Sequence, residues 1–148
     1  MTTMKGNQSL QKALDVIDAV DHGCRQLKDI CDQLQMPKST AHRIVQGLLD
    51  ARYLREVKGI GFVLGTKLIQ LGNRAQQEMP LKEIARPVLQ ELAMVTQDTV
   101  HLGIQDEDHV FYLDKIPGQR SIEMRSRVGD RLPLAVTGIG KALMVDMS

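Results

Sequence analysis

A run of hydrogen-bond donors opens the segment MPKSTAHRIVQGLLDARYL, residues 36–54. If this segment is a helix, the donors lie in its first turn or on the face opposite its apolar stripe: Lys38, Ser39, Thr40, His42, Arg43 and Gln46. A helix in the DNA major groove needs such residues, because small side chains let the backbone approach and donors reach phosphates and base edges. We expect Arg43 to pair with guanine, Gln46 to pair with adenine and Lys38 to bind phosphate.

A solvated core helix is the alternative explanation for any one of these residues, because the outer face of a surface helix is polar by default. Three features together favour DNA binding instead. The face is rich in donors, a three-residue turn precedes the helix, and a hairpin follows it directly.

The elements around this helix predict how it is held. Three short segments carry apolar residues at helical spacing: 9–21, about 26–34 and 37–51. The link Gln35-Met36-Pro37 separates the second from the third, since proline cannot continue a helix but suits the first turn of a new one. Residues 53–57 and 60–64 read as strands joined by Lys58-Gly59. Three helices followed by a hairpin predict a winged helix-turn-helix domain over residues 1–65.

The rest of the chain reads as a connecting helix and a mixed α/β domain, residues 80–148. The apolar face of the connecting helix, residues 66–79, is either core packing or a dimer seam. We favour the seam because a lone helix between domains has no core of its own. After it we expect a helix at 81–95 that Pro87 kinks or splits, and a last helix that starts near Gly138. Strands are expected between them at 99–105, 110–116 and 121–128.

Composition limits the class of protein. The chain has 148 residues, is 43% hydrophobic and 25% charged, and carries a net charge of +1, so a nucleic-acid binder must concentrate positive charge locally. Cys24 and Cys31 lack the spacing of a zinc site, so no metal or cofactor is expected. No apolar stretch has the length of a signal peptide or a membrane span, which favours the reduced cytoplasm.

Three stretches resemble catalytic or ligand sites only weakly. VTGIGKAL has Ala135 and Ala142 where a phosphate-binding P-loop needs a glycine and a Ser or Thr. No nucleophile motif accompanies His101, so a packed or solvated strand residue is the better interpretation. The acidic turn 106–108 lacks the glycine and the distal glutamate of a calcium loop. An enzyme is therefore not expected.

Several motifs, specific only in combination, run from about Ser9 to the end: LKDICDQLQMPKSTAHRIVQGLLDARYL, GFVLGTKLIQLG, ARPVLQELA, TVHLG, VFYLDKI and SRVGDRLPL…GIGKAL. Together they resemble the isocitrate lyase regulator (IclR) family of bacterial transcription regulators. The resemblance implies an α+β protein with an N-terminal winged helix-turn-helix, a dimerising linker helix and a GAF- or PAS-like mixed α/β effector domain. It also implies homodimers, or dimers of dimers, that bind palindromic operators and respond to small carboxylates or sugar acids.

The resemblance assigns roles by position. Five of the donors named above fall in the family's recognition helix: Lys38, Ser39, Thr40, His42 and Arg43. Thr137, Gly138 and Ile139 fall where the family begins a helix beside the effector pocket. The N–H groups at a helix N-terminus are a natural seat for a carboxylate, so these three are the expected effector contacts.

The chain departs from the family pattern in three places. Gly61 and Val63 flank Phe62 in the returning strand, where the family has basic residues, which leaves Arg55 and Lys58 to contact phosphates. Arg52 stands where a glycine is common and adds a charge at the end of the recognition helix. The chain also ends before the strands and helices that complete the family's effector domain, so we expect an incomplete, truncated domain.

The sequence therefore predicts a cytoplasmic DNA-binding regulator, a repressor of a metabolic operon, with the recognition helix over about 37–51. Two such helices of one dimer would enter successive major grooves about 34 Å apart. The alternative is a truncated dimerisation module that pairs with a full-length relative without productive DNA binding. Substituting Arg43 by alanine discriminates between them, because it removes a DNA contact and leaves the dimer intact.

Overall fold

The computed structural model describes residues 8–120 and 126–145. The chain divides into two compact units, Met1–Ala75 and Gln76–Ser148. Helices and short antiparallel sheets occur in both, so the predicted α+β class is confirmed. The domain boundaries predicted from the sequence, 1–65, 66–79 and 80–148, remain predictions.

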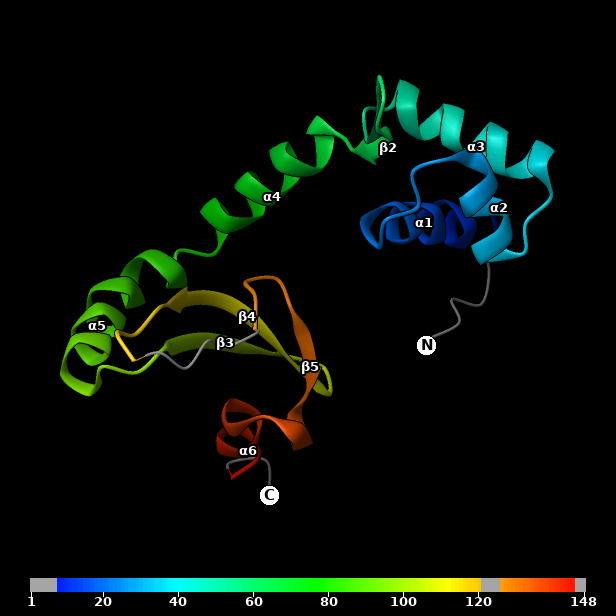
Figure 1. Cartoon of the computed structure of the whole chain (residues 1–148). Coiled ribbons are helices and arrows are strands. Elements are labelled where there is room, and N and C mark those ends of the chain that lie inside the picture. The colour runs from blue at the N-terminus through cyan, green and yellow to red at the C-terminus, as the bar shows by residue number, and fades with distance from the viewer. Residues whose placement is uncertain (1–7, 121–125, 146–148) are drawn as a thin grey trace. The chain divides into compact units, whose positions relative to one another are not determined.

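The N-terminal unit is a winged helix-turn-helix, as predicted (Figure 1). It consists of α1 (Gln8–Asp21), α2 (Leu27–Leu34), α3 (Lys38–Asp50), β1 (Leu54–Val57) and β2 (Gly61–Leu64). The two strands pair antiparallel, with Leu54 opposite Leu64 and Val57 opposite Gly61. Side chains from all three helices and from β1 share one core, which includes Val16, Val20, Ile30, Ala41, Val45 and Leu54.

The loop between α1 and α2 fixes the hairpin in place. The amide of Phe62 donates to the carbonyl of Arg25 at 2.8 Å. The Arg25 guanidinium donates in turn to the carbonyls of Val20, at 2.8 Å, and Phe62, at 3.1 Å. Gly61 has a φ of +99°, and a Cβ at this position would lie 2.1 Å from the Arg25 carbonyl oxygen. Only glycine therefore permits this close approach.

The C-terminal end of α3 is closed by a Schellman motif centred on Arg52. The amides of Arg52 and Tyr53 donate to the carbonyls of Leu49 and Leu48, each at 2.9 Å. Arg52 has a φ of +63°. This left-handed conformation favours glycine and strains a residue with a Cβ. The backbone at this position therefore favours glycine over the arginine that occupies it.

We predict that Arg52→Gly raises the free energy of unfolding by about 0.5–1 kcal/mol, because it removes left-handed strain at the helix end. Thermal denaturation followed by circular dichroism measures the change. Arg52→Ala is the matched control, since it removes the charge and keeps the Cβ. Equal stabilisation by both variants would show that the charge, and not the backbone strain, is what matters.

Two further helices follow the hairpin. α4 (Thr66–Glu78) crosses the boundary between the two units, and none of its residues, all of which the structure describes, is buried. α5 (Leu81–Thr96) continues through Pro87, so of the two alternatives predicted at this residue the split is wrong, and the kink stays a prediction. Proline removes one hydrogen bond to the carbonyl four residues earlier. Glu83 and Pro87 are both exposed, so the missing hydrogen bond lies on the solvent side of the helix.

A three-stranded antiparallel sheet, in the order β3-β4-β5, forms the centre of the C-terminal unit (Figure 1). β3 (Val100–Asp106) and β4 (His109–Ile116) make the predicted hairpin, with Glu107 at a φ of +55° in the turn. η1 (Leu134–Val136) and α6 (Gly138–Val145) follow β5, and α6 begins at the glycine predicted for it.

The third strand lies later than predicted. β5 is Arg131–Pro133, whereas we expected a strand at 121–128. Residues 121–125 are outside the described residues, and 126–128 are not in a strand. Backbone contacts from the following turn explain the shift. The carbonyl of Tyr112 accepts from the amide of Gly129 at 2.8 Å, and its amide donates to Asp130 at 2.9 Å. These bonds place Arg131, and not Ser126, in register with β4.

The sheet carries a helix on each face. Leu102 pairs with Asp114 and Gly103 with Tyr112, on either side of an irregularity in β4. Neighbouring residues of a strand point to opposite faces and paired residues share a face, so Asp114 and Tyr112 lie on opposite faces. α5 contacts the Asp114 face, and Ile139 of α6 packs beside Gly103 on the Tyr112 face.

A buried carboxylate joins α5 to the sheet. Asp114 is 3% exposed and accepts from Arg86 at 3.0 Å. The ammonium of Lys82, one helical turn earlier, lies 3.7 Å from its other oxygen. Both cations keep access to water, with side chains 48% and 28% exposed. The two cations therefore compensate the buried charge of Asp114 while they themselves stay in contact with solvent.

We predict that Asp114→Asn lowers the free energy of unfolding by about 1–2 kcal/mol, because it removes a charge-assisted bond and leaves both cations solvated. Urea denaturation followed by circular dichroism measures the loss. Asp98→Asn is the control, since Asp98 pairs with Arg120 on the surface and is worth little. Equal effects of the two substitutions would contradict a special role for Asp114.

Candidate nucleic-acid interface and effector site

Helix α3 separates its polar and apolar faces as the sequence predicts. Ala41 and Val45 are 0% and 3% exposed and belong to the core. The predicted DNA contacts are exposed, except Thr40, which is half-buried: Lys38, Ser39, Thr40, His42, Arg43 and Gln46. The structure thus brings all six together on the outer side of one helix. Their role in DNA binding remains a prediction.

Hydrogen bonding distinguishes these six residues. Among the described residues, four of these side chains form no hydrogen bond or ion pair: Lys38, Ser39, His42 and Arg43. The Gln46 amide donates to the Asp50 carboxylate at 3.1 Å. One of the two amide hydrogens of Gln46 is therefore engaged within the helix, and the other remains for a base. Arg43 is the better candidate for base contact, because no described partner engages its guanidinium.

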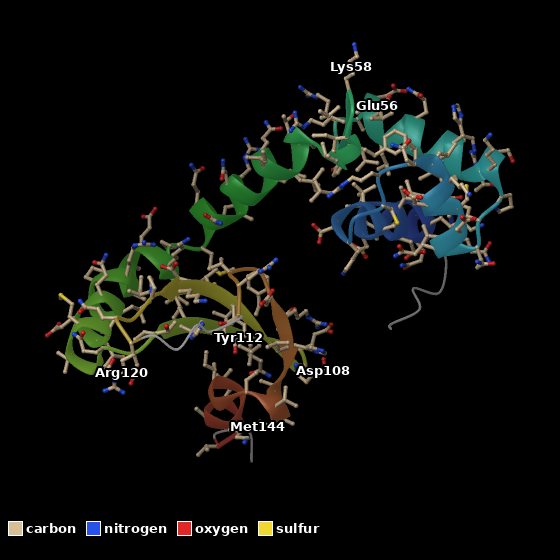
Figure 2. The ribbon with its side chains drawn as sticks, in the orientation of Figure 1. Glu56, Lys58, Asp108, Tyr112, Arg120 and Met144 are labelled. Carbon is tan, nitrogen blue, oxygen red and sulfur yellow. The ribbon has the colours of Figure 1, made fainter. Side chains whose placement is uncertain are left out.

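The hairpin carries the other two predicted contacts. Arg55 is exposed on β1, and Lys58 lies in the turn that joins the strands. Figure 2 shows Lys58 projecting outward from the end of the hairpin, with Glu56 nearer its base. Arg55 and Glu56 are neighbours on one strand, so their side chains point to opposite faces. The acidic side chain therefore does not share the face of Arg55.

Two of the three predicted effector residues make contacts within the fold. The hydroxyl of Thr137, which is 7% exposed, accepts from the amide of Gly140 at 2.8 Å and so caps α6. Ile139 is half-buried and packs against Val110, Tyr112 and Leu134. Gly138 is exposed. One of the N–H groups expected to receive a carboxylate is therefore already bonded within the chain. An effector role for these residues stays a prediction.

We predict that Thr137→Val destabilises the start of α6 by about 1 kcal/mol, because it removes the cap and keeps the shape of the side chain. Amide hydrogen exchange at Gly140 reports the loss directly. Thr137→Ser keeps the hydroxyl and is expected to keep the protection. Unchanged exchange in the valine variant would show that the cap contributes nothing and leave the threonine available for a ligand.

A polar cluster on β3 and β4 was missed by the sequence analysis. His101 lies directly opposite Lys115, and its Nε2 is 2.6 Å from the Ser126 hydroxyl. The Lys115 ammonium donates to the carbonyl of Ser126 at 2.8 Å, and the Tyr112 ring meets His101 edge-on at 5.3 Å. Burial lowers the pKa of His101, and the charge of Lys115 lowers this pKa further. The imidazole is therefore neutral at pH 7.

The contact between His101 and Ser126 lacks, among the described residues, the third group of a catalytic triad. A catalytic serine needs a base whose second nitrogen is held by an orienting group. No described residue forms a hydrogen bond with the other ring nitrogen of His101. Strand alternation alone indicates the faces of His101 and Lys115, but no pattern in the sequence indicates that Ser126 lies beside them.

Metal and membrane sites are not indicated. No group of three or more His, Cys, Asp or Glu residues within the described part of the chain is placed to hold a metal ion. Among the helices that the structure describes, none is long and apolar enough to cross a membrane.

Comparison with known proteins identifies the family. Residues 9–58 match the family model for the IclR helix-turn-helix domain. Residues 73–147 match the model for the C-terminal domain of the bacterial transcriptional regulator IclR. The chain belongs to the IclR family. The resemblance read from its motifs is thus confirmed.

Individual relatives agree with this assignment. The chain is 35% identical over 137 residues to the uncharacterised regulator RhmR of Escherichia coli, covering 92% of this chain and 53% of the relative. It is 36% identical over 119 residues to the E. coli regulator KdgR, covering 80% and 45%. Both are named as transcriptional regulators rather than as enzymes. The chain spans about half the length of the curated relatives it matches.

Solved structures share the fold. The Thermotoga maritima IclR structure has a TM-score of 0.71 at 28% identity, over 92% of this chain and 56% of that one. An IclR homolog of Microbacterium hydrocarbonoxydans, crystallised with 4-hydroxybenzoate, has a TM-score of 0.82 at 22% identity, over 95% and 60%. At 22% identity, the similarity to the Microbacterium homolog shows a shared fold only.

Proposed function

We propose that this protein is a sequence-specific DNA-binding transcriptional repressor whose helix α3 enters the major groove. The observation that supports this most directly is the exposed donor face of α3, where Arg43 is held by no other described side chain. The rigid hairpin beside it brings Arg55 and Lys58 to the same unit. Relatives include the E. coli transcriptional repressor IclR and the Salmonella typhimurium acetate operon repressor, each 27% identical.

The repressor acts as a homodimer, or a dimer of dimers, on a palindromic operator in the cytoplasm. α4 is the proposed linker and dimer seam, because Leu71 on its apolar stripe is 39% exposed and the helix buries none of its residues. A two-fold dimer places its recognition helices one turn of DNA apart, about 34 Å, which matches two half-sites. The regulated genes form a metabolic operon.

A small carboxylate or sugar acid is the proposed effector. The polar cluster of His101 and Lys115 lies on the same sheet face as Gly103, beside which Ile139 of α6 packs. That face thus combines a cation with the start of α6, where Thr137, Gly138 and Ile139 lie. The 4-hydroxybenzoate bound by the Microbacterium homolog is a ligand of the same chemical class.

A second function is favoured by the exposed apolar residues of α5. Ile84, Val88 and Val95 are 70%, 65% and 77% exposed. Exposed apolar patches mark interaction surfaces. These residues therefore form a surface through which the chain can act as a dimerisation module that pairs with a relative and blocks productive DNA binding.

Retention of sheared genomic DNA by the purified chain, followed by sequencing, tests the first function. We expect an enriched palindrome, and we expect Arg43→Ala to weaken binding to it about tenfold to a hundredfold, because a bidentate arginine–guanine pair discriminates by about 1–3 kcal/mol. Arg43→Lys is the matched control. It keeps the charge and loses the fork, so it is expected to lose specificity while keeping binding to random DNA.

Sedimentation of the same variants separates the two functions. The mass of the wild-type assembly is expected to persist in Arg43→Ala, because this residue faces away from the core. Loss of the dimer in that variant, or retention of DNA without an enriched motif, would favour the interaction module.

A further inference from the structure

A continuous apolar stripe runs along α5 from one end to the other. Its five residues are all exposed, by between 40% and 77%: Leu81, Ile84, Val88, Leu92 and Val95. At 3.6 residues per turn these five fall within an arc of about 80°, and no other residue of the helix falls inside that arc. A surface helix normally turns such a stripe toward its own core, so α5 is unusual in leaving it in solvent.

The contacts of α5 with the sheet keep the stripe exposed. The ammonium of Lys82 and the guanidinium of Arg86 lie 3.7 and 3.0 Å from the Asp114 carboxylate. Ala93 is 6% exposed. Around the helix axis Lys82, Arg86 and Ala93 lie about 120–160° from Val88. The stripe therefore cannot turn inward while these ion pairs hold, and a contiguous apolar patch in solvent marks an interaction surface.

The spacing of the stripe is the same in both directions from Val88. Ile84 and Leu92 lie four residues from it, and Leu81 and Val95 lie seven. Consider a second copy of α5 that runs antiparallel and is related by a two-fold axis at Val88. Leu81 of one copy is then level with Val95 of the other, and Ile84 is level with Leu92. A two-fold interface between identical chains needs this self-complementarity, because each contact occurs twice.

The charged residues of α5 fit the same arrangement. Each of the four is level with an uncharged residue of the second copy: Lys82 with Met94, Glu83 with Ala93, Arg86 with Gln90, and Glu91 with Ala85. Like charges placed opposite each other would cost several kcal/mol. The antiparallel pair avoids this cost over the whole length of the helix.

We propose that α5 pairs with α5 of a second copy of this chain, antiparallel and with Val88 on the two-fold axis. The inference rests on the second function proposed above, which makes these residues an interaction surface, and it names the partner and the register. It does not require that the chain binds DNA.

Single cysteines test the register. A disulfide needs two Cα atoms about 4.4–6.8 Å apart, and only a residue near the two-fold axis meets its own copy at that distance. We therefore expect Val88→Cys to join two chains under mild oxidation. Leu81→Cys alone is expected to leave the chains separate, because its two copies would lie about 21 Å apart. Combining Leu81→Cys with Val95→Cys is expected to join them.

Two controls distinguish this pairing from chance collision. Met94→Cys lies on the same helix outside the stripe, and Met94 is 64% exposed against 65% for Val88. The wild-type chain, oxidised in the same way, reports any disulfide through Cys24 or Cys31. Both controls are expected to remain single chains.

Charge exchange tests the same contact without a covalent bond. Val88→Glu brings two carboxylates together at the axis and is expected to halve the sedimenting mass of the assembly. Ile84→Glu is expected to have the same effect. Adding Leu92→Lys to Ile84→Glu is expected to restore the mass, since the two substituted residues then meet as an ion pair on each side of the axis. Met94→Glu is the matched control and is expected to leave the mass unchanged.

The outcomes separate this pairing from the proposed repressor. A Val88→Cys chain that stays single, or one that cross-links no more than Leu81→Cys, overturns the pairing. A wild-type mass in Val88→Glu also overturns it and leaves the stripe to a different partner, such as a relative. A wild-type chain that retains no genomic DNA overturns the repressor instead, and the helix pair stands if Val88→Cys still cross-links.

Discussion

The arrangement of the N-terminal unit depends on one backbone contact, the hydrogen bond from the Phe62 amide to the Arg25 carbonyl. It fixes the returning strand against the loop between α1 and α2, and it is possible only because Gly61 has no Cβ. The other end of the hairpin is fixed in the same way. The Gly65 amide donates to Tyr53 at 2.7 Å, and a Cβ on Gly65 would lie 2.1 Å from the Arg52 carbonyl oxygen. Because the hairpin is held at one end by the loop between α1 and α2 and at the other by the segment that follows α3, Arg55 and Lys58 are displayed at a defined position in the unit.

Local sequence rules were sufficient for most elements of this fold. α1, α2 and α3 each bury one continuous apolar stripe, so helical periodicity alone located them to within a residue or two. The β3–β4 hairpin was equally readable, because β-rich runs flank an acidic turn. The donor face of α3 followed from the same periodicity. A residue opposite a buried stripe is exposed whatever the rest of the chain does.

The features that were predicted wrongly or not at all share a different cause. Each of them depends on a contact with a residue that is distant in sequence. The alternating residues at 121–128 suggested a strand, but the pairing of Tyr112 with Gly129 and Asp130 placed β5 later. Ser126 reaches His101 across 25 residues. None of these contacts leaves a local pattern.

A net charge of +1 is compatible with a DNA-binding protein because of how its charges are paired. In the C-terminal unit several cations are neutralised locally: Arg86 and Lys82 by Asp114, Arg120 by Asp98, and Arg131 by Asp106. In the N-terminal unit no described carboxylate lies within ion-pair distance of Lys28, Lys38 or Arg43. A polyanion gains only from cations that are not already paired. α2 and α3 together carry three Lys or Arg residues and three Asp residues, so the placement of unpaired cations, and not an excess of charge, supports the proposed DNA contact.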